Sequence, residues 1–94
     1  MGRAARPKSK RLGSKLLRIR ESLGKTQEEM LEELGLAGRR FRSAISGYEL
    51  GTREPPLTVL LMYAELAGVW LDILVDDALN LPKKLPADQR KQLR

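Results

Sequence analysis

Glycines at positions 24, 35, 51 and 68 divide the middle of the chain into short stretches in which apolar residues recur every three or four positions. That spacing places the apolar residues on one face of a helix, and glycine is the residue that most readily ends a helix. β-branched and aromatic residues, which favour strands, are sparse, whereas Leu, Arg, Glu, Lys and Ala are frequent. The sequence therefore predicts an all-α protein built from short helices.

Five helices are expected between these glycines. The first begins at Leu12 and ends at Gly24, and a capping box in "TQEE" starts the second at Gln27. A third is predicted over about residues 40–50, a fourth between the prolines of "PPL" and Gly68, and a short fifth over residues 70–75. The residues expected to face the core are Met30, Leu31 and Leu34 in the second, Phe41, Ala44, Ile45 and Tyr48 in the third, Leu57, Leu60, Leu61 and Ala64 in the fourth, and Leu71 and Leu74 in the fifth.

A chain of 94 residues has room for one such domain. We expect a basic, disordered arm over residues 1–11, the helical domain over residues 12–76, and a C-terminal tail over residues 77–94. Pro82 and Pro86 interrupt the tail, which lies along the domain or hangs free.

The charge of the chain favours an anionic partner. Eighteen Lys and Arg against 12 Asp and Glu give a net charge of +6. Nine basic residues and one acid lie between positions 2 and 25, and the stretch "QEEMLEELG" that begins two residues later carries four acids. An acidic block beside a basic one argues against a membrane-coating helix and leaves nucleic acid as the favoured partner.

Other classes of function are disfavoured by what the sequence lacks. No apolar run approaches the ~20 residues of a membrane span, and no secretory leader is recognisable, so a soluble, cytoplasmic protein is expected. The chain has no Cys and therefore no thiolate or disulfide, and it has no His, which is the commonest metal ligand and general base. We expect no metal, no cofactor and no enzymatic activity.

Two short helices joined by a turn, with a basic loop after the second, are typical of a helix-turn-helix DNA reader. The segments "TQEEMLEELG", "AISGYELGTREP" and "LTVLLMYAELAGVWLDIL" resemble the Cro-like phage-repressor family, also called the xenobiotic-response-element helix-turn-helix family. The resemblance runs from Leu12 to about Asp76 and implies a five-helix, repressor-like domain. It further implies a sequence-specific transcriptional regulator, most simply a repressor, whose third helix reads the major groove of double-stranded DNA.

The resemblance also assigns roles to individual residues. It implies base contacts at Arg42, Ser43, Ser46 and, as a further candidate, Gly47, and phosphate contacts at Gln27, Thr52 and Arg53. Helical spacing places Arg39, Arg42, Ser43 and Ser46 on one stripe opposite the apolar residues of the third helix. Arg39, Arg40, Arg53 and the N-terminal arm are expected to contact phosphate or the minor groove. For Arg42 a guanine or a phosphate contact is open, and for Gln27 a phosphate contact, a bond to a neighbouring side chain, or a plain helix-start role.

Two features of this region concern structure. Glu49 borders the buried face of the third helix and needs a partner, for which Arg20 is the expected residue; the family commonly pairs Arg and Glu at the matching positions. The chain also carries about four residues more than the family between Gly35 and Ile45. These extra residues either lengthen the third helix or form a loop over residues 38–40.

Trp70 stands where the family usually has a small polar capping residue. With Ile73 and Val75 it forms a candidate patch for a second subunit, since two-fold DNA sites are usually read by dimers. Alternatively, Leu81, Pro82 and Leu85 of the tail cover it. The patch also motivates a second hypothesis on the same fold, an antitoxin-like or other module that binds a protein partner.

Overall fold

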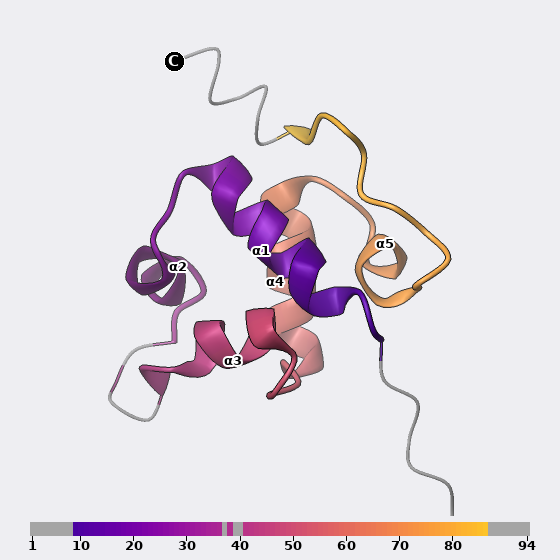
Figure 1. Ribbon diagram of the computed structural model, residues 1–94. Coiled ribbons are helices and arrows are strands. Elements are labelled where there is room, and N and C mark those ends of the chain that lie inside the picture. Colours follow the sequence, from indigo (N-terminus) through magenta and orange to yellow (C-terminus); the bar gives the residue numbers. More distant parts are fainter. Residues whose placement is uncertain (1–8, 37, 39–40, 87–94) are drawn as a thin grey trace, which may run out of the picture.

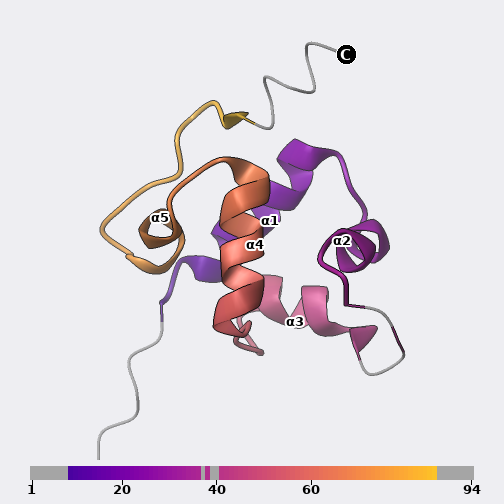
Figure 2. The ribbon, with the colours of Figure 1, turned by 180° about the vertical axis from the view of Figure 1, so that it is seen from behind.

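The described part of the chain folds into five helices around one core. The computed structural model describes residues 9–36, 38 and 41–86, and within them contains no strand. The helices are α1 (Leu12–Leu23), α2 (Gln27–Glu33), α3 (Ala44–Leu50), α4 (Leu57–Ala67) and α5 (Leu71–Val75). Helices α1 and α4 cross at the centre, with α2 and α5 on either side and α3 below them (Figures 1 and 2). The predicted all-α architecture of five helices is confirmed for the described residues.

The helix ends follow the local sequence signals. At the start of α2, the Thr26 hydroxyl accepts from the Glu29 amide at 3.0 Å, and the Glu29 carboxylate accepts from the Thr26 amide at 2.8 Å. This is the predicted capping box, in which two amides without helical partners are satisfied by each other's side chains. Helices α1, α3 and α4 end at glycines 24, 51 and 68, which adopt the left-handed conformation that a side chain would oppose.

The core lies among the five helices. Its fully buried members include Leu16 and Ile19 of α1, Met30 of α2, Ile45 of α3, Tyr63 of α4 and Leu74 of α5. These residues come from every helix, so burial of apolar surface holds all five elements to one centre. A buried lysine, Lys15, adds a polar link, since its ammonium donates to the carbonyls of Ile73 at 2.6 Å and Asp76 at 3.0 Å.

The predicted inward face of α4 is partly wrong. Leu57 is 68% exposed and Leu61 is 46% exposed, although both were expected in the core with Leu60 and Ala64. The buried face instead consists of Val59, Leu60, Tyr63, Ala64 and Ala67. Because α4 is apolar almost all round, the spacing of its leucines does not distinguish the face that packs from the face that is exposed.

The start of α3 also differs from the prediction. The helix begins at Ala44 rather than near residue 40, because the carbonyl of Ser43 is the first to accept a helical bond, from the Gly47 amide at 3.0 Å. Gly38 has a φ of +110°, which no right-handed helix contains, and the Phe41 amide closes a turn onto the Gly38 carbonyl at 3.1 Å. The extra residues therefore do not extend α3 back to Gly38.

The segment after α5 returns to the domain. Leu85 is completely buried, Leu81 packs against the core, and Pro86 lies against Gly68 at the end of α4. This segment does not cover Trp70, which remains 82% exposed. Residues 87–94 of the expected tail, and residues 1–8 of the expected arm, lie outside the described residues.

Candidate nucleic-acid interface

The outer surface of α3 carries small polar residues flanked by an arginine. Arg42 and Ser43 are exposed and immediately precede the helix, and Ser46 in its first turn is half-buried. Arg39 and Arg40 lie outside the described residues, so the expected stripe is seen only from Arg42 onward. The prediction that Arg42 and Ser43 lie on a helical face is wrong. Because α3 starts at Ala44, both residues project from the turn that enters the helix.

Leu50 extends this surface, although it is not among the site residues expected from the sequence. It is 74% exposed and follows Ser46 by four positions, which places both on one side of α3. The spacing of four positions from Ser46 indicates that Leu50 shares the exposed side of α3. A leucine at the end of an amphipathic helix, however, is more often a core residue. The exposed surface of α3 thus runs from Arg42 through Ser43 and Ser46 to an apolar end at Leu50.

Gly47 lies beneath the side chain of Arg53. A Cβ atom on Gly47 would approach the Arg53 Cδ to 2.5 Å, and Gly47 is buried. The Gly47 carbonyl accepts the amides of Thr52 at 3.0 Å and Arg53 at 3.1 Å, which ties the loop after α3 to the helix. The geometry argues against Gly47 as a base contact, because the aliphatic part of Arg53 covers it. Its small size instead makes room for Arg53.

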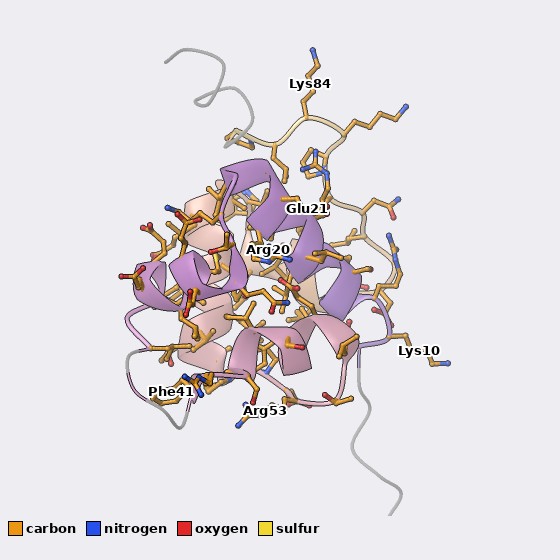
Figure 3. All side chains as sticks on the ribbon, turned by 60° about the vertical axis from the view of Figure 1, so that its left-hand side comes forward. Lys10, Arg20, Glu21, Phe41, Arg53 and Lys84 are labelled. Atoms are coloured by element: carbon orange, nitrogen blue, oxygen red, sulfur yellow. The ribbon has the colours of Figure 1, made fainter. Side chains whose placement is uncertain are left out.

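Thr52 and Arg53 are exposed on this loop. Figure 3 shows Phe41 and Arg53 along the edge of the molecule formed by α3, with Lys84 at the opposite edge. Positions at both ends of α3 therefore present side chains at one edge, which is the arrangement that a single extended partner would contact.

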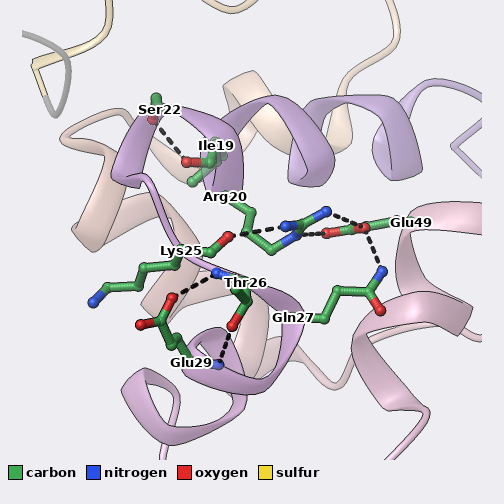
Figure 4. Close-up of polar contacts among 8 residues, drawn as sticks. All are labelled: Ile19, Arg20, Ser22, Lys25, Thr26, Gln27, Glu29 and Glu49. Atoms are coloured by element: carbon green, nitrogen blue, oxygen red, sulfur yellow. Dashed lines mark hydrogen bonds and ion pairs between the residues drawn. The ribbon is translucent and has the colours of Figure 1, made fainter.

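Behind this edge, Arg20 of α1 binds Glu49 of α3 through two hydrogen bonds (Figure 4). Arg20 Nε lies 2.6 Å from Glu49 Oε2, and Arg20 Nη2 lies 3.2 Å from Glu49 Oε1. These are the two residues for which the sequence predicts an ion pair. Their side chains are 17% and 7% exposed, and the hydrogen bond to Glu49 is the main cause that raises the pKa of Arg20. Arg20 also donates to the Lys25 carbonyl at 2.9 Å, so the pair links α1, α3 and the entry to α2.

Gln27 joins the same network. Its side-chain amide donates to Glu49 Oε1 at 3.0 Å, which is the bond to a neighbouring side chain that the sequence left open (Figure 4). A glutamine amide has two N–H donors, so one remains for another acceptor. Gln27 is exposed at the first position of α2, and Glu49 holds its side chain in a defined orientation.

The candidate subunit patch does not form one continuous surface. Trp70 is 82% exposed, Val75 is 42% exposed, and Ile73 is half-buried. Ile73 and Val75 are two positions apart on α5, and at ~100° per residue they project on roughly opposite sides. Trp70 is therefore the dominant exposed apolar feature of this end of the molecule.

The described residues also bear on membrane insertion and metal binding. None of the described helices is long and apolar enough to cross a membrane. In the same part of the chain, no group of three or more His, Cys, Asp or Glu residues has a geometry that would hold a metal ion.

Comparison with known proteins identifies one family. A family model described as helix-turn-helix, of the Cro/C1 type, matches residues 16–74, which is more than half of the 94-residue chain. Neither the comparison with curated proteins nor that with solved structures found a match. The matched span contains α2, α3 and the network formed by Arg20, Gln27 and Glu49.

Proposed function

The chain belongs to the Cro/C1-type helix-turn-helix family, and from this premise we propose that it is a sequence-specific regulator of transcription that binds double-stranded DNA. Such a family match supports a DNA-binding regulator in general terms. The observation that carries the specific proposal is the exposed edge formed by Arg42, Ser43, Ser46 and Arg53, which joins α3 to its following loop. We propose repression as its effect, as the resemblance to the phage repressors implies.

In this proposal, the start of α3 enters the major groove. Arg42 is exposed just before the helix and is long enough to offer two donors to the O6 and N7 atoms of guanine. Ser43 and Ser46 are short enough to let the helix approach the base edges closely. Leu50 adds an apolar group that suits the methyl group of thymine.

Contacts to the DNA backbone flank the reading surface. Arg53 and Thr52 lie on the loop after α3, and Gln27 at the start of α2 retains an N–H for a phosphate oxygen. Arg39, Arg40 and the basic residues of the N-terminal arm are proposed to add contacts to phosphate or to the minor groove. The phosphate contacts among them fix the register of the protein but carry no direct sequence information.

Selection of binding sites from a pool of random duplexes at defined salt tests the proposal. With a selected site in hand, Arg42→Ala should reduce the ratio of specific to random affinity by ~5- to 150-fold, the equivalent of ~1–3 kcal/mol. Arg53→Ala should weaken binding to both duplexes alike and reduce the slope of log affinity against log salt by ~0.9. Lys84→Ala is the matched control, because it removes one positive charge at the opposite edge (Figure 3).

Two results would contradict the proposal. Full discrimination by the Arg42→Ala protein would remove Arg42 from the base contacts. A pool from which the wild-type chain enriches no sequence would overturn sequence-specific binding altogether.

Binding as a homodimer is proposed as well, with Trp70 at the contact between subunits. A tryptophan that is 82% exposed is unusual on a monomer and supports burial against another chain. A palindrome in the selected sites would support the dimer, since two-fold DNA sites mirror two-fold proteins. The same exposure favours a protein-partner module as the second candidate. Asymmetric sites, together with a stable complex formed with a different protein through Trp70 in the absence of DNA, would favour that candidate.

A further inference from the structure

A set of hydrogen bonds outside the family match joins the start of the domain to the segment after α5. We call it the terminal junction, meaning residues 9–11 together with residues 77–80. The Asp77 carboxylate accepts from the Ser9 hydroxyl at 2.6 Å, the Lys10 amide at 2.9 Å and the Arg11 amide at 3.1 Å. In return, the Arg11 guanidinium donates to the Asp77 carbonyl at 2.6 Å, the Leu79 carbonyl at 3.3 Å and the side chain of Asn80.

Asp77 is the centre of this junction. Its three donors, with the Ser9 hydroxyl contributing most, lower the pKa of Asp77 to about 2, so the carboxylate is charged at neutral pH. Nearby, Lys15 holds the end of α5 through the carbonyls of Ile73 and Asp76. Residues 9–11 are therefore held by backbone and side-chain bonds on a part of the domain that is itself anchored.

The junction lies close to the proposed DNA contacts. Ser9 lines a cleft together with Gly51, Arg53 and Glu54, so the chain enters the domain beside the loop that follows α3. The residues immediately before it in the sequence include the cations Arg3, Arg6 and Lys8, which lie outside the described residues. Residues 9–11 and 77–80 both lie outside the matched span of 16–74, so the family match does not account for their contacts.

We propose that Asp77 is a positioning residue for DNA binding. It fixes the point at which the basic residues Arg3, Arg6 and Lys8 join the domain, beside the loop of Arg53, so that they contact the duplex bound by α3. Fixing the attachment point of a charged segment near its target strengthens binding, because less conformational freedom remains to be lost when the segment binds. This inference rests on the proposed function.

The test is a double-mutant cycle in the full-length chain, measured on a duplex that carries the selected site at several salt concentrations. The four proteins are the wild type, Asp77→Asn, an arm variant with Arg3→Gln, Arg6→Gln and Lys8→Gln, and the combination of both changes. Asparagine matches the size of aspartate but places an N–H₂ group against backbone donors, so the junction loses acceptors. Asp72→Asn is the matched control, because Asp72 is exposed on α5 and lies outside the junction. Its substitution changes the net charge by the same amount as Asp77→Asn. Circular dichroism melting verifies that each variant is folded.

Each variant in the cycle has an expected affinity and salt slope. The arm variant should bind more weakly, with a salt slope reduced by up to ~2.7 for three lost phosphate contacts. Asp77→Asn should weaken binding ~10-fold in the wild-type background, which equals ~1.4 kcal/mol. This is about the entropic cost of fixing the backbone of one residue, which the variant would have to pay on binding. The same change should reduce the salt slope, and in the arm-variant background its effect should fall below ~2-fold. Asp72→Asn should not weaken binding.

Several results would overturn the proposal. An equal loss of affinity from Asp77→Asn in both backgrounds would show that Asp77 acts only through the fold. No loss in either background, or an unchanged salt slope, would show that the junction does not direct the arm. If the wild-type chain binds the selected duplex, these results leave the proposed function intact. If it binds no duplex, the proposed function fails and this inference with it.

Discussion

Tyr63 shows how a single residue departs from the rule that buried polar groups are paired. Its side chain is completely buried, and among the described residues its hydroxyl is the one buried side-chain polar atom without a hydrogen-bond partner. Burial, followed by the charge of Glu49, raises the pKa of Tyr63, so the hydroxyl stays neutral. An unpaired buried hydroxyl costs ~1–3 kcal/mol, and Tyr63→Phe removes that cost while it preserves the ring. We expect this substitution to raise the free energy of unfolding by about 1 kcal/mol in urea denaturation.

The matched control for this prediction is Tyr48→Phe. Tyr48 is 6% exposed and lines the cleft beside Arg53, where its neighbourhood is open to solvent. Its replacement should change the free energy of unfolding by less than ~0.5 kcal/mol. A loss of stability in Tyr63→Phe beyond that of the control would mean that the Tyr63 hydroxyl is hydrogen-bonded in solution.

At the scale of elements, α1 and α3 approach so closely that only glycine fits between them. A Cβ atom on Gly13 would lie 2.5 Å from the Glu49 carbonyl oxygen and 3.0 Å from that of Tyr48. Both neighbours are backbone atoms, so the helices would have to move apart. Gly13→Ala should lower the free energy of unfolding by ~1–3 kcal/mol, despite the ~1 kcal/mol by which alanine favours a helix over glycine.

Thermal melting of Gly13→Ala beside Ser14→Ala checks this expectation. Ser14 is the exposed neighbour on α1, and its replacement should leave stability within ~0.5 kcal/mol. Since the same contact places Glu49 opposite Arg20, we also expect Gly13→Ala to disturb that ion pair. A melting temperature of Gly13→Ala equal to or above that of the wild type would show that α1 and α3 tolerate a wider separation.

The sequence predicted some elements better than others for physical reasons. Capping residues act within a few positions, so the start of α2 at Gln27 and the glycine ends of α1, α3 and α4 were predicted correctly. The contact between Arg20 and Glu49 was predicted because a carboxylate at the border of the buried face needs a partner. The exposure of Leu57 and the start of α3 at Ala44 were missed, because the first depends on which side of an apolar helix meets α1 and the second on the conformation of Gly38.

At the scale of the whole molecule, the domain extends beyond the part that defines its family. The matched span ends at residue 74, yet residues 77–80 hold residues 9–11 and Leu85 fills part of the core. The sequence could not decide whether this segment packs, because its prolines and lysines are compatible with either outcome. No periodic pattern marks Leu85, whose burial depends on a path that returns to the end of α4.

Leu85→Ala tests whether the segment after α5 is part of the folded unit. Its side chain is completely buried, and loss of a buried leucine costs ~2–5 kcal/mol through lost burial and the cavity that remains. Leu57→Ala makes the same chemical change at a side chain that is 68% exposed, and should cost less than ~0.5 kcal/mol. Urea denaturation of the two variants beside the wild type measures the difference. If both variants unfold at the same urea concentration, Leu85 does not contribute to the core in solution, and the segment that carries it is not required for the stability of the helical domain.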